Sequence, residues 1–261
     1  MSTMTALSRA EFTLLGRNRV LLFNALVMPL VLPIVLLVVA GRDGGLTDAG
    51  VSAALEIFAL FLLVFLVYYN LLSVYATRRD ELVLKRLRTG ESTDAQILLG
   101  PAVPSFLLTL LLGVIVGVVV VVLGGGIPVN VLLIAAALVG GAALFAALAL
   151  ITSAFTRNAE AAQITSLPVI LLAMLGSSLL RDVVPESLAD VVALTPMAAV
   201  SDLLNLGWFG TTSVGDAAGG ADSVGFASTF AEAGQPALVM LAWIAGSVLI
   251  ARTHFRWEPR S

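Results

Sequence analysis

The sequence predicts an all-α integral membrane protein, and two observations carry that prediction. Hydrophobic residues make up 59% of the 261 residues and charged residues only 12%, whereas soluble domains are about 25% charged. The apolar residues also gather in long segments, and a segment of roughly 20 such residues is long enough to cross a bilayer as a helix. Because hydrocarbon offers the backbone no hydrogen-bonding partner, each crossing segment is expected to be helical.

Six segments have this length, and each is expected to be a transmembrane helix. They are residues 20–40, 53–77, 97–123, 131–155, 161–180 and 236–251. Six crossings place both termini on one side. Twelve of the 14 basic residues lie in the terminal segments and in the second and fourth loops, which leaves Arg42 and Arg181 for the other side. The positive-inside rule therefore predicts cytoplasmic N- and C-termini. The high content of Ala, Val, Gly and Leu favours a multi-pass protein of a bacterial cell membrane.

The long connection between the fifth and sixth spans is expected on the outer side. Its first part, 183–206, is apolar with helical spacing, contains Pro185 and Asp202, and is divided by Pro196. This pattern favours two outer re-entrant helices over a seventh span, which would move the basic tail to the outer side. The second part, 210–234, is rich in Gly, Ala, Ser, Thr and Asp, which predicts a surface loop.

Before the first span, apolar residues recur at helical spacing and predict an amphipathic helix at the cytoplasmic interface. These residues are Met4, Leu7, Ala10 and Leu14.

The most charged part of the chain is the segment 78–96, between the second and third spans. It holds nine of the 31 charged residues, while the flanking stretches 57–77 and 97–123 hold none. Such a segment must lie in water, at the cytoplasmic surface. Its charges could serve only as topological anchors, but its length and pattern favour a helix on which another protein docks.

Several short-range signals support a helix in this segment. Leu84 and Leu87 share one helical face, and Glu81 with Lys85 has the spacing of a favourable i,i+4 ion pair. Gly90 is expected to stop the helix. Beyond it, Thr93 and Gln96 have the spacing of a capping box that opens the third span. The expected arrangement is a helix, a turn and a capped helix.

Polar side chains inside the spans have two interpretations. They could line a path for an amphipathic substrate, or form interhelical hydrogen bonds and an aromatic belt at the membrane surface. These residues are Tyr68, Asn70, Ser73, Gln163 and Ser166. The one acidic residue well inside a span is Glu56, which we expect to reach the outer surface. The absence of an ionisable residue at mid-membrane depth disfavours a proton-driven carrier.

The sequence excludes several kinds of chemistry. It has no cysteine and a single histidine, His254, so it offers neither thiolate ligands nor the set of side chains that zinc requires. We find no metal constellation and no nucleophile motif, and therefore expect no enzyme. The phosphate-binding pattern GxxxxGK[ST] does not occur, so this chain cannot cradle ATP by itself.

Three segments in this order resemble the membrane subunit of ABC-2 type exporters: RAEFTLLGRNRVLLFNALVMPLVLPIVL, RRDELVLKRLRTGESTDAQILLG and VPESLADVVALTPMAAVSDLL. The resemblance implies that the first is an interface helix leading into span one. It implies that the second is the coupling helix that meets the ATPase, and that the third is the outer re-entrant pair. The residues that it places at the coupling contact are Arg79, Glu81, Leu84, Lys85, Leu87 and Arg88.

The resemblance also implies partners. ATP and magnesium would bind a separate ABC ATPase subunit, and the permease would pair with an identical or homologous copy in membrane lipid, with no nucleic acid involved. The expected function is drug-like or lipid-like export through a path for hydrophobic or amphipathic molecules. A secondary, ion-coupled carrier and a non-transporting membrane scaffold remain as alternatives.

Overall fold

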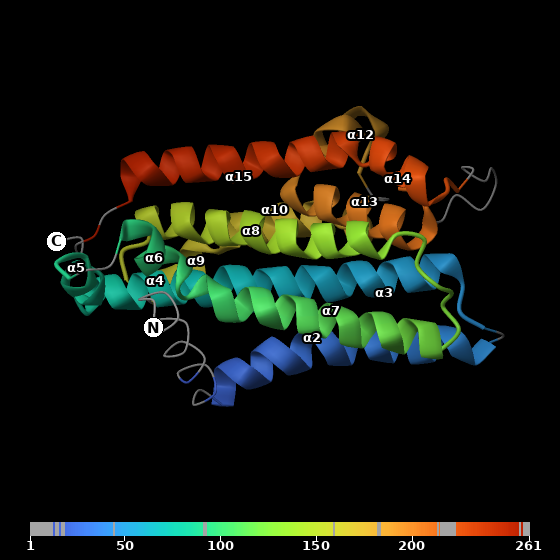
Figure 1. The fold of residues 1–261 in the computed structure, drawn as a ribbon, viewed down its shortest axis with the longest axis horizontal. Helices are drawn as coiled ribbons and strands as arrows, with labels where there is room; N and C mark the ends of the chain where they lie inside the picture. The colour runs from blue at the N-terminus through green and yellow to red at the C-terminus, as the bar shows by residue number, and fades with distance from the viewer. Residues whose placement is uncertain are drawn as a thin grey trace.

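The protein is all-helical in the computed structural model, which describes residues 13, 16, 19–43, 45–90, 93–158, 160–181, 184–212, 214, 223–255 and 257. Its long helices lie side by side along the longest dimension of the molecule (Figure 1). α2 (Arg19–Ala40) begins, and α15 (Gly234–His254) ends, at the end of the molecule that carries α5 (Val83–Arg88) and α6 (Asp94–Leu99) (Figure 1). The interface helix predicted at Met4, Leu7, Ala10 and Leu14 lies outside the described residues.

One continuous helix of 33 residues, Asp48–Asp80, forms the buried centre of the bundle. It consists of α3 (Asp48–Phe61), the π-helical stretch η2 (Leu62–Tyr69) and α4 (Asn70–Asp80). Thr47 caps its start, because the Thr47 hydroxyl accepts a 3.2 Å hydrogen bond from the Gly50 N–H. The helix is longer at both ends than the expected span 53–77.

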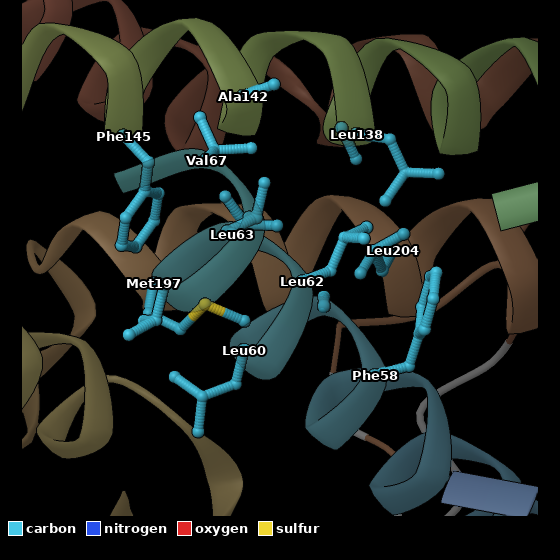
Figure 2. Close-up of a cluster of buried hydrophobic side chains, with 14 of the residues drawn as sticks. Phe58, Leu60, Leu62, Leu63, Val67, Leu138, Ala142, Phe145, Met197 and Leu204 are labelled. Carbon is cyan, nitrogen blue, oxygen red and sulfur yellow. The ribbon is translucent and has the colours of Figure 1, made fainter. Parts of the chain in front are cut away.

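The middle of this helix is surrounded by protein, as expected of a helix that is apolar on every side. Figure 2 shows Leu62, Leu63 and Val67 of η2 between side chains of α8 (Val131–Phe155) and α13 (Pro196–Phe209). All three are fully buried. The π-helical turn is wider than an α-helical turn, so it changes the face on which the following residues lie.

The expected third span consists of two helices. α6 is followed by a turn at Gly100 and Pro101, and then by α7 (Ala102–Val122). The predicted capping box is confirmed: the Gln96 N–H donates to Thr93 Oγ1 at 3.3 Å, and the Thr93 N–H donates to Gln96 Oε1 at 3.0 Å. It opens α6, not the long helix. The next long helix, α8, has the bounds expected for the fourth span, and the Leu133 N–H donates to Asn130 Oδ1 at its start.

The expected fifth span is also divided. Residues 161–180 form α9 (Ala161–Thr165), α10 (Leu167–Leu175) and α11 (Ser178–Arg181), with a break at Gly176. At that glycine a Cβ atom would lie only 2.8 Å from the backbone nitrogen of Ala198. The end of α10 can therefore reach the start of α13 only because residue 176 lacks a side chain.

Two helices with a sharp bend occupy the segment expected to be re-entrant. α12 (Glu186–Ala193) and α13 meet at an angle of 81°. Pro196 is the first residue of α13, where a missing N–H costs no helical hydrogen bond. α13 is buried along nearly its whole length and packs against α8 and α15. The bend lies where Pro196 predicts it.

In the part of the chain that the structure describes, four helices are long and apolar enough to cross a membrane: 48–80, 102–122, 131–155 and 234–254. The bent pair would be a fifth span if it crosses as one unit. Two shorter apolar helices, Leu26–Ala40 and Ala161–Leu175, accompany them. α14 (Phe226–Glu232) lies in the segment 210–234, where a loop was expected, so that prediction is wrong for these residues; residues 213 and 215–222 lie outside the described part.

The contact between α13 and α8 generates a stability prediction. At Gly207 a Cβ atom would lie 2.7 Å from Ile134 Cγ1 and 3.1 Å from the Asn130 carbonyl oxygen. Because a backbone atom cannot rotate away, we expect Gly207→Ala to destabilise the protein by about 1–3 kcal/mol. Thermal unfolding of the purified protein in mild detergent measures the change.

The matched control for Gly207→Ala is Gly246→Ala on α15, where a Cβ atom would meet nothing within 4 Å. This variant should be as stable as the parent, or more stable by up to about 1 kcal/mol, because Ala favours helix more than Gly does. Equal unfolding midpoints for the two variants would contradict the packing described for α13.

Candidate functional site

The charged segment 78–96 folds as two short helices joined by turns. α4 ends at Asp80, and Leu82 takes the left-handed conformation with φ 60° and ψ 14° before α5 begins. A left-handed non-glycine residue is uncommon and interrupts a helix. Glu81 and Lys85 therefore do not belong to one helix, and the predicted i,i+4 relation between them is wrong. α5 is followed by a turn at Thr89 and Gly90, and Gly90 is not left-handed.

The apolar residues of α5 face the protein. Leu84 is fully buried, and Val83 and Leu87 are half-buried. The side chains of Glu81, Lys85, Arg86 and Arg88 are exposed. α5 thus has the two faces that its sequence predicts, but Leu84 is used within the chain and is not accessible to a docked partner.

Arg79 connects this segment to α8. Its side chain is fully buried, and its guanidinium donates hydrogen bonds to the carbonyl oxygens of Ser153 at 2.7 Å, of Thr156, and of Arg157 at 3.5 Å. These carbonyls lie at and just beyond the carboxyl end of α8, where a helix leaves carbonyl groups without helical partners and where a cation is favoured. The Ser153 carbonyl also accepts a 3.2 Å hydrogen bond from the Thr156 N–H. Arg79 therefore caps α8, although the sequence places it among the residues that contact a partner.

Further contacts fix the other side of the segment. The Tyr75 hydroxyl donates to the Leu98 carbonyl at 2.8 Å, which joins α4 to α6. Arg88 lies 3.2 Å from Asp94 in an ion pair, and its guanidinium stacks on the Trp257 ring with 4.8 Å to the ring centroid. The result is a positioned, mostly basic surface at one end of the bundle, defined by Glu81, Lys85, Arg86 and Arg88. We call it the α5 surface.

The family model of the ABC-2 type transporter matches residues 3–204. The chain belongs to the ABC-2 type transporter family. It is therefore a transmembrane subunit of an ABC transporter, which is a multi-pass transport component and not an enzyme, and subunits of this family normally work with an ATPase subunit. The sequence has no significant match among curated proteins.

In this ABC-2 subunit the polar residues of the second span bond to other helices. The Tyr68 hydroxyl donates to Thr152 Oγ1 of α8 at 3.2 Å, and Asn70 Nδ2 donates to Ser105 Oγ of α7 at 3.3 Å. Both side chains are buried. Interhelical bonding, one of the two interpretations of these residues, is thus present at both positions, and Ser73 is half-buried beside them on α4.

Gln163 of α9 and Ser166, which follows α9, are not hydrogen-bonded to Tyr68 or Asn70. Gln163 is exposed, and Ser166 is buried with its hydroxyl donating to the Gln163 carbonyl at 2.8 Å. A substrate path along these residues stays a prediction.

A buried polar cluster in the half of the bundle away from α5 was not predicted. Glu56 is buried, so the expectation that it reaches the surface is wrong. Asn205 Nδ2 donates to Glu56 Oε1 at 2.9 Å, and Ser52 Oγ donates to Asn205 Oδ1 at 2.8 Å. One turn earlier on α13, Asp202 pairs with Arg181 at 2.6 and 3.2 Å.

This polar cluster attaches the bent pair to the rest of the ABC-2 fold. The cluster bonds α13 to α3 through Asn205 and to α11 through Asp202. Pro185 is exposed just before α12, whereas Pro196 is buried at the start of α13. The spacing of Asp202 and Asn205, three residues apart on a helix, was the available sequence signal for a shared polar face.

The cap on α8 generates the second prediction. Arg79→Met removes a donor from the carbonyls of the buried residues Ser153 and Thr156, and a buried acceptor left without a partner costs about 1–3 kcal/mol. We expect a clear loss of unfolding free energy for the detergent-purified protein. Arg86→Met, an exposed position on α5, should change it by no more than about 0.5 kcal/mol. If both variants unfold like the parent, Arg79 does not hold the end of α8.

Proposed function

We propose that this chain is the membrane subunit of an ATP-driven exporter and that a separate ABC ATPase binds the α5 surface. The observation that carries the proposal is the construction of that surface: exposed charges on a short helix, which is itself held to α8 by the buried side chain of Arg79. ATP and magnesium would bind the partner, because this chain has no phosphate-binding loop.

The proposed topology has six crossings, with both termini in the cytoplasm. α2 begins and α15 ends at the same end of the molecule as α5 (Figure 1), which is what an even number of crossings requires. In this arrangement α2, with 22 residues, is the first crossing. α9–α11 form the fifth, and α12 with α13 is the outer re-entrant pair. Basic residues favour the α5 end as the cytoplasmic one.

The contacts of α5 divide the predicted coupling residues into two groups. Glu81, Lys85 and Arg88 are exposed, as is the neighbouring Arg86, and we assign these four to the contact with the ATPase; Leu87 is half-buried. Arg79 and Leu84 are buried, and we assign them to transmission instead of docking. When the ATPase subunits close on ATP, they would displace the α5 surface. Because Arg79 and Leu84 fix α5 to the bundle, the displacement would pass into α4 and α8.

Transport then requires two arrangements of the spans to which the ATPase binds with different affinity. The long helix 48–80 extends from the α5 surface to the polar cluster at Glu56. It is therefore the direct mechanical connection between the proposed ATPase contact and the outer half of the bundle. We propose that movement of this helix opens the path.

The substrate that fits this chain best is hydrophobic or amphipathic. The buried polar atoms of Tyr68, Asn70 and Glu56 already have partners within the chain, and most of the other buried residues are aliphatic or aromatic. Two copies, identical or homologous, would enclose the path. Transport driven by an ion gradient without nucleotide would instead support a secondary carrier, and ATPase binding without transport would support a scaffold.

Charge reversal tests the ATPase contact. The double variant Lys85→Glu and Arg86→Glu should retain membrane insertion but bind the ABC ATPase that co-purifies with the parent at least about tenfold more weakly, because it places repulsive charges in the contact. Co-purification from membranes and ATP hydrolysis in lipid nanodiscs measure the loss.

The matched control is Arg42→Glu. Arg42 is an exposed basic residue on η1 (Gly41–Asp43), which follows α2 at the end of the bundle opposite α5. It should leave ATPase binding unchanged. Full ATPase binding and ATP-dependent export in the double variant would refute docking on the α5 surface.

A further inference from the structure

A cavity of about 360 Å³ lies between α3, α7, α8 and α13. Its walls include Val114, Gly117 and Val118 of α7, Leu138 of α8, and Leu204 and Trp208 of α13. The function proposed above makes no use of it. It is separate from the polar side chains of the second and fifth spans, none of which lines it.

The cavity opens toward the outer surface of the helix bundle. Three residues of its wall on α7 are strongly exposed: Val114 at 65%, Val118 at 56% and Val122 at 77%. α7 and α8 are both candidate membrane spans. In a membrane, an aliphatic surface on these helices faces hydrocarbon. The mouth of the cavity therefore opens to lipid chains and not to water.

Only apolar contacts are available inside. Every lining residue is aliphatic, aromatic, glycine or proline. The single side-chain polar atom is the indole nitrogen of Trp208, and it already donates to the Gly125 carbonyl at 3.0 Å. An apolar cavity of this kind excludes water and favours an apolar occupant. A charged or hydrogen-bonding ligand would lose its hydration without gaining a partner.

Glycine makes the space. At Gly117 a Cβ atom would meet only the Trp208 ring, at an ordinary contact distance of 3.8 Å. A larger side chain at this position would thus enter the cavity without striking the backbone. Gly113, one turn earlier, belongs to the same wall. A Cβ atom at Gly113 would clash with the Leu138 side chain of α8. The GxxxG pattern of α7 thus allows a close contact with α8 at Gly113 and borders the cavity at Gly117.

We propose that this cavity binds one acyl chain of a membrane lipid, which enters from the bilayer beside α7 and α8. A methylene group needs about as much space as a water molecule, roughly 30 Å³, so the cavity accommodates on the order of ten chain carbons. The chain would contact α7, α8 and α13 together, and would rest on the ring of Trp208. The site depends on these helices lying in a membrane but does not depend on ATP-driven export.

Trp208 provides a direct probe. The chain has three tryptophans, so Trp243→Phe with Trp257→Phe leaves Trp208 as the only one. Its side chain is only 4% exposed. The protein is reconstituted in phosphatidylcholine vesicles whose acyl chains carry bromine, which quenches indole fluorescence at short range. We expect loss of most Trp208 emission relative to the same vesicles without bromine.

Gly117→Leu, added to this background, should fill the cavity and restore most of the emission. Gly246→Leu is the matched control, because the same substitution on α15 meets open space, and it should leave quenching unchanged. If Gly117→Leu lowers the unfolding midpoint, Gly117→Ala serves instead and should restore part of the emission. Absence of quenching in the variant that keeps only Trp208 overturns the proposal. Occupation of the cavity by a second copy of this chain would also overturn it. Equal quenching with and without the Gly117→Leu substitution also overturns it.

Discussion

The fold depends on one set of hydrogen bonds, which the buried guanidinium of Arg79 donates to the carbonyl groups at the end of α8. A buried cation without partners is costly, and so are helix-terminal carbonyls without donors. Each satisfies the other through the bonds to Ser153, Thr156 and Arg157. Because Arg79 lies in the last turn of α4, the bonds also fix the position of the chain as it turns into α5. The proposed ATPase contact is thus built on a rigid support.

A second polar contact lies in the half of the same long helix that is farther from α5, where Glu56 accepts a hydrogen bond from Asn205. The two contacts attach one helix to α8 near the α5 end and to α13 in the opposite half. Between them runs η2, whose π-helical turns offer a place where a long helix can change its pitch. The proposed transmission of movement from the α5 surface to the bent pair would therefore need no flexible linker.

Much of the architecture could be predicted from hydropathy and capping signals. The bounds of α8 and the capping box at Thr93 follow from local patterns that no distant residue alters. Other features depend on partners far along the chain. The role of Arg79 depends on the end of α8, because its partner Ser153 lies 74 residues further along the chain. The burial of Glu56 likewise depends on Asn205, which lies 149 residues away. The left-handed turn at Leu82 could not be predicted either, because no glycine occupies that position. The π-helical stretch changes which residues share a helical face, so a 3.6-residue period assigns some of them to the wrong face.

We propose above all that a separate ATPase binds the α5 surface from the cytoplasm. Since the chain contains no cysteine, Lys85→Cys introduces a single thiol into that surface, and site-specific cross-linking in intact membranes reports what lies against it. We expect a cross-link from residue 85 to an ABC ATPase, with a yield that changes when ATP is added. A thiol at residue 85 that reacts only with reagents outside the cell, or that never joins the ATPase, would contradict it.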